Sequence, residues 1–335
     1  MVTVALDGRG VEQGTEVLIA GAKLALGDGI RLRVFGDPAE LAPLADLGAE
    51  VVDAPGEISN DDDPVKSVRS REDASIVMAA ADVADGRSDA LVSAGPTGAT
   101  MTAALFALRR LSGVRRPSLA VQLPTIGHDG PPTLFLDAGA NSDARSQDLV
   151  QFAVMGAAFS RAVLGVSEPR VALLSVGEES KKGSADVVEA HAELAGLDGI
   201  RFIGNIEGRD LLAGKAEVIA TDGFTGNVAL KTLEGTAKTV GSAVGDAARS
   251  NPLSAVGGLM LRPALGGLRR QMDPDMTGGA ILLGVRGVAV VGHGSSGPEG
   301  IANAVRLAVR AVREEATERT GELLESAGAT RASLK

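Results

Sequence analysis

Three residue types are missing from this 335-residue chain, and each absence excludes a class of protein. The chain has no cysteine, which excludes disulfide bonds, a thiolate metal site and a cysteine nucleophile. Tyrosine and tryptophan are also absent, and the formal net charge is −10. Proteins that bind nucleic acid usually have a basic surface, and those that bind single strands add aromatic side chains for stacking. We therefore expect no nucleic-acid partner.

Long hydrophobic runs are missing as well. No uninterrupted apolar segment is long enough to span a bilayer, and residues 1–7 have neither the basic lead-in nor the apolar length of a signal peptide. The hydrophobic fraction of 44% and the charged fraction of 23% are typical of a folded domain. These features predict a cytoplasmic protein whose contact with a membrane, if it has one, is peripheral.

Short apolar, β-branched runs alternate with longer segments of helical period along most of the chain. Most of these runs are apolar on both faces, as in the strands of a parallel sheet that helices cover. The pattern predicts a three-layer α/β/α fold, doubly wound around a mostly parallel sheet, as a single domain in two lobes over residues 1–312. The charged segment 313–335 is expected to fray beyond the last helix. The expected strands are 2–6, 30–35, 50–54, 90–93, 119–123, 133–137, 170–176, 201–203, 217–220 and 288–291.

Ligands of such folds bind at the carboxyl ends of strands, so glycine-rich turns after strands are candidate sites. The first turn contains Gly95, Thr97 and Gly98. Glycine permits close approach of the backbone to a ligand, and a helix that begins at Thr97 offers free N–H groups to an anion. The alternative is a plain β–α turn in which Thr97 is the N-cap.

Two further turns combine polar side chains with glycine. The second contains Asp137 and Asn141, which either face a ligand or form an Asx-type turn before the next helix. The third contains Glu178 and Lys182 between glycines after another buried strand. A charged loop of this kind is either functional or simply solvated.

The fourth turn opens a predicted helix near Thr225. On that helix Asn227, Lys231 and Glu234 share one face. A lysine and an amide in the first turns of a helix, beside the carboxylate of Asp222 in the loop before it, suit a small oxyanion and an acyl carbonyl. The alternative is a capped helix with an exposed polar face.

The fifth turn contains His293, Ser295 and Ser296 between glycines, just before a helix. Successive backbone N–H groups in such a turn can form a nest for an anion. The chain has only three histidines, so no histidine cluster indicates a metal. A serine hydrolase is not indicated either, because the G-x-S-x-G motif is absent.

Segment 251–273 lies outside the α/β pattern. Leu261, Leu265 and Leu268 form a helical apolar stripe with arginines beside it, and Pro263 suits the first turn of a helix. An apolar face flanked by arginines predicts a peripheral membrane contact, and a dimer-interface hairpin would bury the same stripe. Both readings stay open.

The motifs together resemble one family, the bacterial acyl-acyl-carrier-protein:phosphate acyltransferases of the PlsX type. Three positions depart from the family pattern: only Asp7 and some glycine remain of an N-terminal Asp-Ala-Met-Gly-Gly-Asp loop, Pro96 replaces an asparagine, and residues 277–281 replace a Tyr-Gly-Gly-Ala-Pro segment. The segments that carry the resemblance, in family order, are 63–64 with Arg69, 93–98, 136–141, 151–156, 177–183, 202–210, 221–235 and 293–296.

The resemblance implies a fold related to phosphate acetyltransferases and isocitrate-dehydrogenase-like enzymes, and a homodimer. It implies transfer of a long acyl chain from acyl carrier protein to inorganic phosphate. The acyl phosphate product would feed a membrane glycerol-3-phosphate acyltransferase of the PlsY type in phospholipid synthesis. Two alternatives are a phosphate acetyltransferase-like enzyme that acts on acyl-CoA and a non-catalytic scaffold of lipid synthesis, which the altered N-terminal loop favours.

A mechanism follows as a hypothesis. Phosphate, held by backbone N–H groups and by a lysine, attacks the thioester carbonyl while side chains and a helix N-terminus stabilise the oxyanion. A dedicated base is optional because phosphate is already an anion, and no metal or organic cofactor is needed. The expected catalytic residues are Asp222, Asn227 and Lys231. The expected substrate-binding residues are Gly95, Thr97, Gly98, Asp137, Asn141, Glu178, Lys182, Thr225, Gly226, His293, Ser295 and Ser296.

Acyl carrier protein is acidic, so an enzyme of net charge −10 needs a local basic surface to bind it. Arg109, Arg110, Arg115 and Arg116 are candidates for this surface. Their ordinary role would be as cations at a helix C-terminus.

Overall fold

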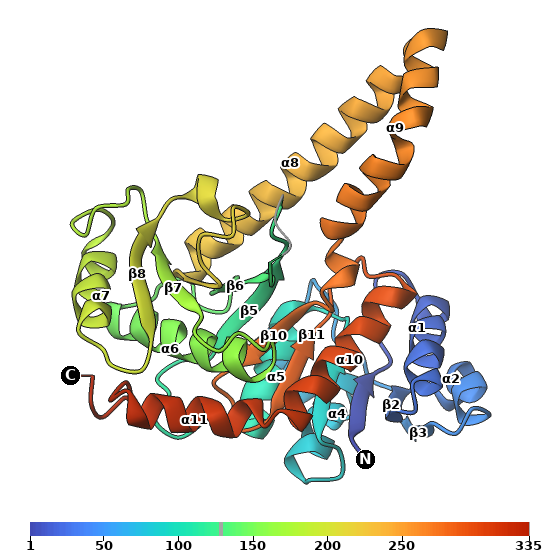
Figure 1. Cartoon of the computed structure of the whole chain (residues 1–335). Helices are drawn as coiled ribbons and strands as arrows, with labels where there is room; N and C mark the ends of the chain where they lie inside the picture. The colour runs from blue at the N-terminus through green and yellow to red at the C-terminus, as the bar shows by residue number, and fades with distance from the viewer. Residues whose placement is uncertain (127–129, 335) are drawn as a thin grey trace.

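One eleven-stranded sheet runs through the computed structural model, which describes residues 1–126 and 130–334, without the side chains at 264, 265, 268, 269 and 274. The strand order is β3-β2-β1-β4-β11-β10-β5-β6-β9-β7-β8 (Figure 1). The strands are β1 Thr3–Asp7, β2 Arg31–Gly36, β3 Glu50–Asp53, β4 Ala90–Ser93, β5 Ser118–Leu123, β6 Thr133–Leu136, β7 Arg170–Leu174, β8 Arg201–Ile206, β9 Val218–Ala220, β10 Ala280–Leu283 and β11 Val288–Val291.

The sheet consists of two parallel groups that run in opposite directions. We call β3, β2, β1, β4 and β11 the first strand group, and β6, β9, β7 and β8 the second. Between them, three successive pairings are antiparallel: β11 with β10, β10 with β5, and β5 with β6. The carboxyl ends of the two groups therefore point in opposite directions, and the register places the end of β11 at Val291 level with Phe135, one residue before the end of β6.

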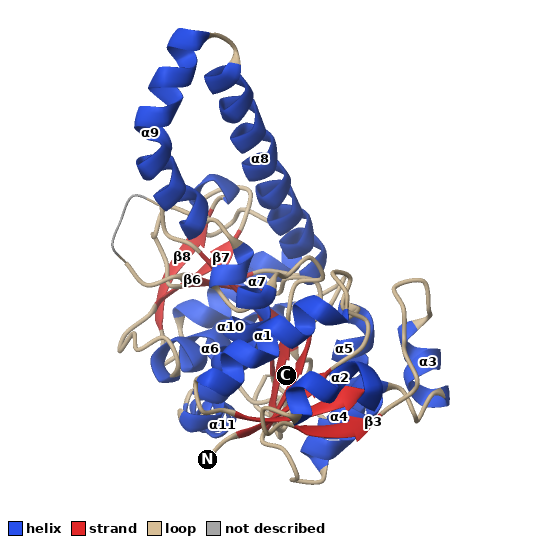
Figure 2. Cartoon of the chain, turned by 90° about the vertical axis from the view of Figure 1, so that its right-hand side faces the viewer, coloured by secondary structure: helices blue, strands red, loops and turns tan. Residues whose placement is uncertain are grey.

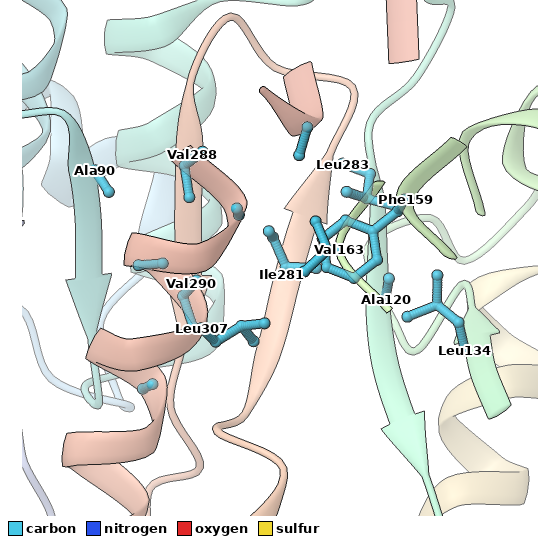
Figure 3. Close-up of a cluster of buried hydrophobic side chains, with 14 of the residues drawn as sticks. Ala90, Ala120, Leu134, Phe159, Val163, Ile281, Leu283, Val288, Val290 and Leu307 are labelled. Carbon is cyan, nitrogen blue, oxygen red and sulfur yellow. The ribbon is translucent and has the colours of Figure 1, made fainter. Parts of the chain in front are cut away.

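Helices cover both faces of the sheet, which confirms the predicted α/β/α class. Alternate strand residues enter different cores, as the two-residue period of a strand requires. Figure 3 shows part of one core, where Phe159 and Leu307 belong to the same buried cluster as Ile281 and Val290. The helices of this core are α1 Thr15–Gly27, α2 Pro38–Ala45, α6 Ser146–Ala162, α7 Ala185–Ala195 and α10 Pro298–Arg313. The other face carries α3 Pro64–Ser70, α4 Ser75–Ala84, α5 Thr97–Leu108 and the start of α8.

Two long helices form an arm that projects from the body of the protein (Figures 1 and 2). The arm consists of α8 Gly223–Arg249 and α9 Pro252–Gln271. Ala229 and Leu230 pack the first turns of α8 against the sheet. Within the described part of the chain, no helix is long and apolar enough to cross a membrane.

Pro263 lies inside α9, so its predicted place in a first helical turn is wrong. Pro252 begins that helix instead. A proline costs least at the start of a helix, where its missing N–H has no intrahelical partner. Pro252 and Pro263 lie in the same segment, and the sequence pattern does not show which of them occupies the first turn of the helix.

The C-terminal segment is more ordered than the sequence pattern indicated. Residues expected to fray form α11, Ala316–Ser326, which packs on the α6 side of the sheet with Leu324 fully buried. Farther on, Gln151 donates a hydrogen bond of 2.8 Å to the carbonyl of Ala329, and the Arg331 amide donates to the carbonyl of Gly113 at 2.7 Å. A few apolar residues at helical spacing, set among many charges, are enough to hold this segment on the core.

Candidate active site

The second and fourth turns interlock where β6 and β9 end side by side. The amide of Gly223 donates to the carbonyl of Asn141 at 2.8 Å, and the amide of Asp137 donates to the carbonyl of Thr221 at 3.1 Å. A Cβ at Gly226 would lie only 1.8 Å from the Asp137 carbonyl oxygen. Glycine at 226 is therefore what lets α8 begin directly against the second turn.

Asp137 is buried at the centre of that junction. Its carboxylate accepts hydrogen bonds from the amides of Leu119, Gly139 and Ala140, and both the amide and the side chain of Asn141 donate to it at 2.8 and 2.7 Å. Burial raises the pKa of the Asp137 carboxyl, and the hydrogen bonds, that of Ala140 foremost, oppose the rise. By accepting these hydrogen bonds, the Asp137 carboxylate holds the turn in its conformation.

Asp222 and Asn227 lie at the start of α8. Asp222 is the N-cap, accepting from the amide and hydroxyl of Thr225 at 2.8 and 2.7 Å. Asn227 lies against Gly139, where an added Cβ would be 3.3 Å from its amide nitrogen. Asn227 and Thr225 are both exposed, so α8 presents an amide and a hydroxyl beside the second turn.

Lys231 lies two turns into α8, where Leu230 packs against Ala280 and Val291 near the end of β11. Its Nζ lies 2.8 Å from Oε2 of Glu234 and 3.5 Å from Nε2 of His293, which follows β11. Oε1 of Glu234 is 4.0 Å from the same imidazole nitrogen. A lysine, a glutamate and a histidine from the two strand groups thus meet in one cluster.

Ser295 holds the ring of that histidine at Nδ1. Its backbone amide donates to Nδ1 of His293 at 3.2 Å, and its hydroxyl lies 2.7 Å from the same nitrogen. An N–H group only donates, so Nδ1 accepts from the Ser295 amide, and the other ring nitrogen, Nε2, faces Lys231 and Glu234.

The first and fifth turns lie together at the edge where the first strand group ends. The amide of Gly292 donates to the carbonyl of Ser93 at 2.7 Å. Beneath them lies Asp7, which accepts from the hydroxyls of Ser75 and Ser93 at 2.5 and 2.7 Å. Burial is the main cause that raises the pKa of Asp7 to about 6.

Replacing Asp7 with asparagine should stabilise the fold at neutral pH. The folded-state pKa of about 6 exceeds the ordinary value of 3.8, so the wild-type protein loses stability as the pH rises from about 4 to above 6. The shift corresponds to at most about 3 kcal/mol, which the neutral amide would recover. Urea unfolding from pH 4 to 8 measures this. The two proteins should converge near pH 4, and a difference independent of pH would contradict the assignment.

Similar proteins identify the family. A family model described as "Fatty acid synthesis protein" matches residues 2–319. A phosphate acyltransferase of Elusimicrobium minutum (strain Pei191) is 45% identical over 318 residues, which cover 92% of each chain. Another, of Nostoc punctiforme, is 41% identical over 324 residues and covers 95% of each. The chain belongs to the PlsX family.

Solved structures similar to this PlsX-family chain agree on the fold. A phosphotransacetylase from Streptococcus pyogenes superposes with a TM-score of 0.63 at 18% identity, over 93% of this chain and 94% of that one. A 4-hydroxythreonine-4-phosphate dehydrogenase from Klebsiella pneumoniae gives 0.54 at 13%, over 93% and 100%. The likeness at these identities shows the fold alone, and it confirms the predicted relation to phosphate acetyltransferases.

Thr97 of this PlsX-family chain is the first residue of α5, while Pro96 is the N-cap without a side-chain hydrogen bond. The alternative that made Thr97 the cap is therefore wrong. Gly95 is buried close to the Asp7 carboxylate, and Gly98 lies against Pro64. This turn is held by Ser93 and Asp7 beneath it, since the Ser93 hydroxyl accepts from the amide of Gly95 at 3.1 Å.

The third turn follows β7 at the edge where β9 also ends. Glu178 is 3.0 Å from Nζ of Lys215, which also contacts Asp210 at 2.9 Å. Lys182 is exposed and has no ion pair within the described residues. The backbone of this turn is held from below, because the buried side chain of Asn205 donates to the carbonyl of Glu179 at 2.9 Å.

The five turns of this PlsX-family chain thus fall into two sets. Turns two, three and four follow the second strand group, while turns one and five follow the first. Lys231 and His293 connect the sets. The sequence pattern missed Asp7 and Asp275 as buried or capping carboxylates, because each gains its role only from partners distant in the sequence. In the described part of the chain, no group of three or more acidic or histidine side chains is placed to hold a metal ion.

Proposed function

We propose that this chain transfers a long-chain fatty acyl group from acyl carrier protein to inorganic phosphate and releases acyl phosphate. The observation that carries the proposal is the placement of Asn227 and Lys231 on α8, with His293 beside the lysine. Membership of the PlsX family and relatives named phosphate acyltransferase support it.

In the proposed step, a phosphate oxygen bonds to the thioester carbonyl carbon and the carbon–sulfur bond breaks. The sulfur leaves as thiolate and takes a proton from phosphate or solvent. Lys231 attracts the phosphate, with His293 beside it, and Asn227 donates to the developing oxyanion. Asp137 and Asp222 shape the turns from which these groups project.

A direct assay tests the proposal. Acyl-carrier protein incubated with the enzyme and phosphate should give acyl phosphate, detected as hydroxamate, and no product should form without phosphate. Palmitoyl-CoA supplied at the same concentration is expected to react more slowly. Faster reaction with acyl-CoA would support a phosphate acetyltransferase-like enzyme instead. Absence of turnover with either donor would support a non-catalytic scaffold.

The arm is proposed as the surface that delivers the product to a membrane, where a PlsY-type glycerol-3-phosphate acyltransferase would use it. Leu253 and Leu261 on α9 are 83% and 58% exposed, and Val240 and Val244 on α8 are exposed as well. The side chains of Leu265 and Leu268, also expected at this contact, lie outside the described residues. Exposed apolar side chains along a protruding arm suit either a lipid interface or a second copy in the proposed homodimer.

Co-sedimentation with liposomes separates these two readings. Leu253→Asp/Leu261→Asp should reduce the bound fraction severalfold, since charged side chains are costly in the acyl region. The matched control is Val65→Asp, another exposed apolar position, away from the arm on α3. Unchanged liposome binding together with a lower dimer fraction would assign the exposed apolar side chains of the arm to the dimer interface.

The proposed docking surface for acyl carrier protein changes in the light of the structure. Arg115 lies 3.0 Å from the buried carboxylate of Asp148, and Arg116 pairs with Asp143 at 3.3 Å. Arg109 and Arg110 are exposed without an ion pair in the described chain, and Arg286 joins them, donating through its side chain to the Arg110 carbonyl at 3.1 Å. Arg109, Arg110 and Arg286 are therefore the arginines of this surface that no acidic side chain of the described residues neutralises.

A further inference from the structure

The fifth turn is surrounded by carboxylates from three different elements. Asp275, which precedes β10, accepts from the Gly297 amide at 2.8 Å at the N-terminus of α10. Glu12 lies so close that a Cβ at Gly294 would be 2.7 Å from its carboxylate. Glu234 of α8 faces His293 at 4.0 Å. Of these three carboxylates, only Asp275 accepts from a backbone N–H of the turn among the described residues, as an anion bound there would.

Asp275 and Glu12 each have a local hydrogen-bond partner. Asp275 caps α10, and a Cβ at Gly300 would collide with it. Glu12 accepts from the Asn60 side chain at 3.1 Å. Glu234 differs, because its two oxygens are shared between Lys231 at 2.8 Å and His293 at 4.0 Å. Lys231 is a donor, and the two partners follow strands of different groups.

We propose that the Glu234 carboxylate is an internal competitor for phosphate, occupying the place beside Lys231 and His293 that a phosphate oxygen takes in catalysis. The inference rests on the proposed function. A carboxylate and a phosphate are both oxygen anions that accept from an ammonium group. Glu234 sits on the surface of a helix, so rotation about its side-chain bonds releases both partners without moving the backbone.

If Glu234 competes with phosphate, removing its charge should strengthen phosphate binding. Glu234→Gln keeps the size of the side chain and removes its charge, so Lys231 becomes available and an anion no longer opposes the phosphate. The KM for phosphate should fall about fivefold, the scale of a partly exposed ion pair, while the KM for the acyl donor shifts by much less. Glu234→Asp keeps the charge and should leave the phosphate KM within about twofold of the wild-type value.

A binding measurement completes the test. Protection against thermal unfolding by inorganic phosphate should begin at lower phosphate concentration in Glu234→Gln than in the wild type. Asp246→Asn is the matched control, because it removes the other i,i+3 ion pair of α8, 2.8 Å from Arg249, and should leave phosphate protection unchanged. An unchanged or weakened phosphate affinity in Glu234→Gln overturns the inference and leaves Glu234 as a structural partner of Lys231.

The two levels of proposal fail separately. If the wild-type enzyme forms no acyl phosphate, the proposed function fails, yet the protection experiment still measures competition for phosphate. If the wild type turns over and the phosphate KM of Glu234→Gln does not fall, the function stands and the competition is wrong.

Discussion

Lys231→Ala is expected to lower kcat/KM for acyl phosphate formation by at least about a hundredfold. Lys231 is the cation that α8 brings to the junction of the two strand groups, 3.5 Å from His293. A hydrogen bond from a charged donor to a phosphate oxygen contributes about 1.5 to 3 kcal/mol, and removal of Lys231 also leaves Glu234 as an uncompensated negative charge beside the phosphate. The initial rate of hydroxamate formation at varied phosphate measures the loss.

Lys238→Ala is the matched control for that experiment. Lys238 is an exposed lysine two turns farther along the same helix, so its removal changes the net charge and the helix propensity by the same amounts. It should keep near-normal turnover. Equal losses in the two variants would mean that α8 needs positive charge in general, and near-normal turnover in Lys231→Ala would sink its assignment as a catalytic residue.

The sequence alone predicted the fold class and the polar face of the helix that follows the fourth turn. Strand–helix alternation and the doubly apolar runs depend on local period, which a sequence displays directly. A helix was expected to begin near Thr225, and α8 begins two residues earlier, at Gly223; the shared face of Lys231 and Glu234 follows from helical geometry. The structure places these side chains 2.8 Å apart.

The opposite directions of the two strand groups could not be read from the sequence. The inversion depends on β5 and β10, which pair antiparallel with their neighbours. β10 was not expected at all, because Ala280–Leu283 is a run of only four apolar residues behind glycines. Strand direction is a tertiary property, so the sequence did not show that turns two, three and four follow one strand group and turns one and five the other.

The same limit applies to the cluster around Lys231. His293 is 62 residues away in sequence, and only the packing of α8 near the end of β11 brings the two nitrogens together. Asp7 is a comparable case, since the hydroxyls that it accepts from lie 68 and 86 residues away. Local motifs could indicate which residue types lie near strand ends, and the partners were fixed by topology.

Gly226→Ala should destabilise the fold by about 3 kcal/mol or more, the range found when a buried site is overpacked against atoms that cannot move. The new Cβ would lie 1.8 Å from the backbone oxygen of Asp137. Relief requires α8 to move away from the second turn, which would also displace Asn227 from Gly139. Urea unfolding followed by circular dichroism measures the loss, and turnover should fall with it.

Gly235→Ala provides the opposite expectation on the same helix. A Cβ there meets nothing within 4 Å, so the substitution should stabilise α8 by about 0.5 to 1 kcal/mol through helix propensity alone. The pair separates packing from propensity, because both variants add one methyl group to a glycine of α8. If Gly226→Ala unfolded at the same urea concentration as Gly235→Ala, the close junction of α8 with the Asp137 turn would be wrong, and with it the placement of Asn227 at the candidate active site.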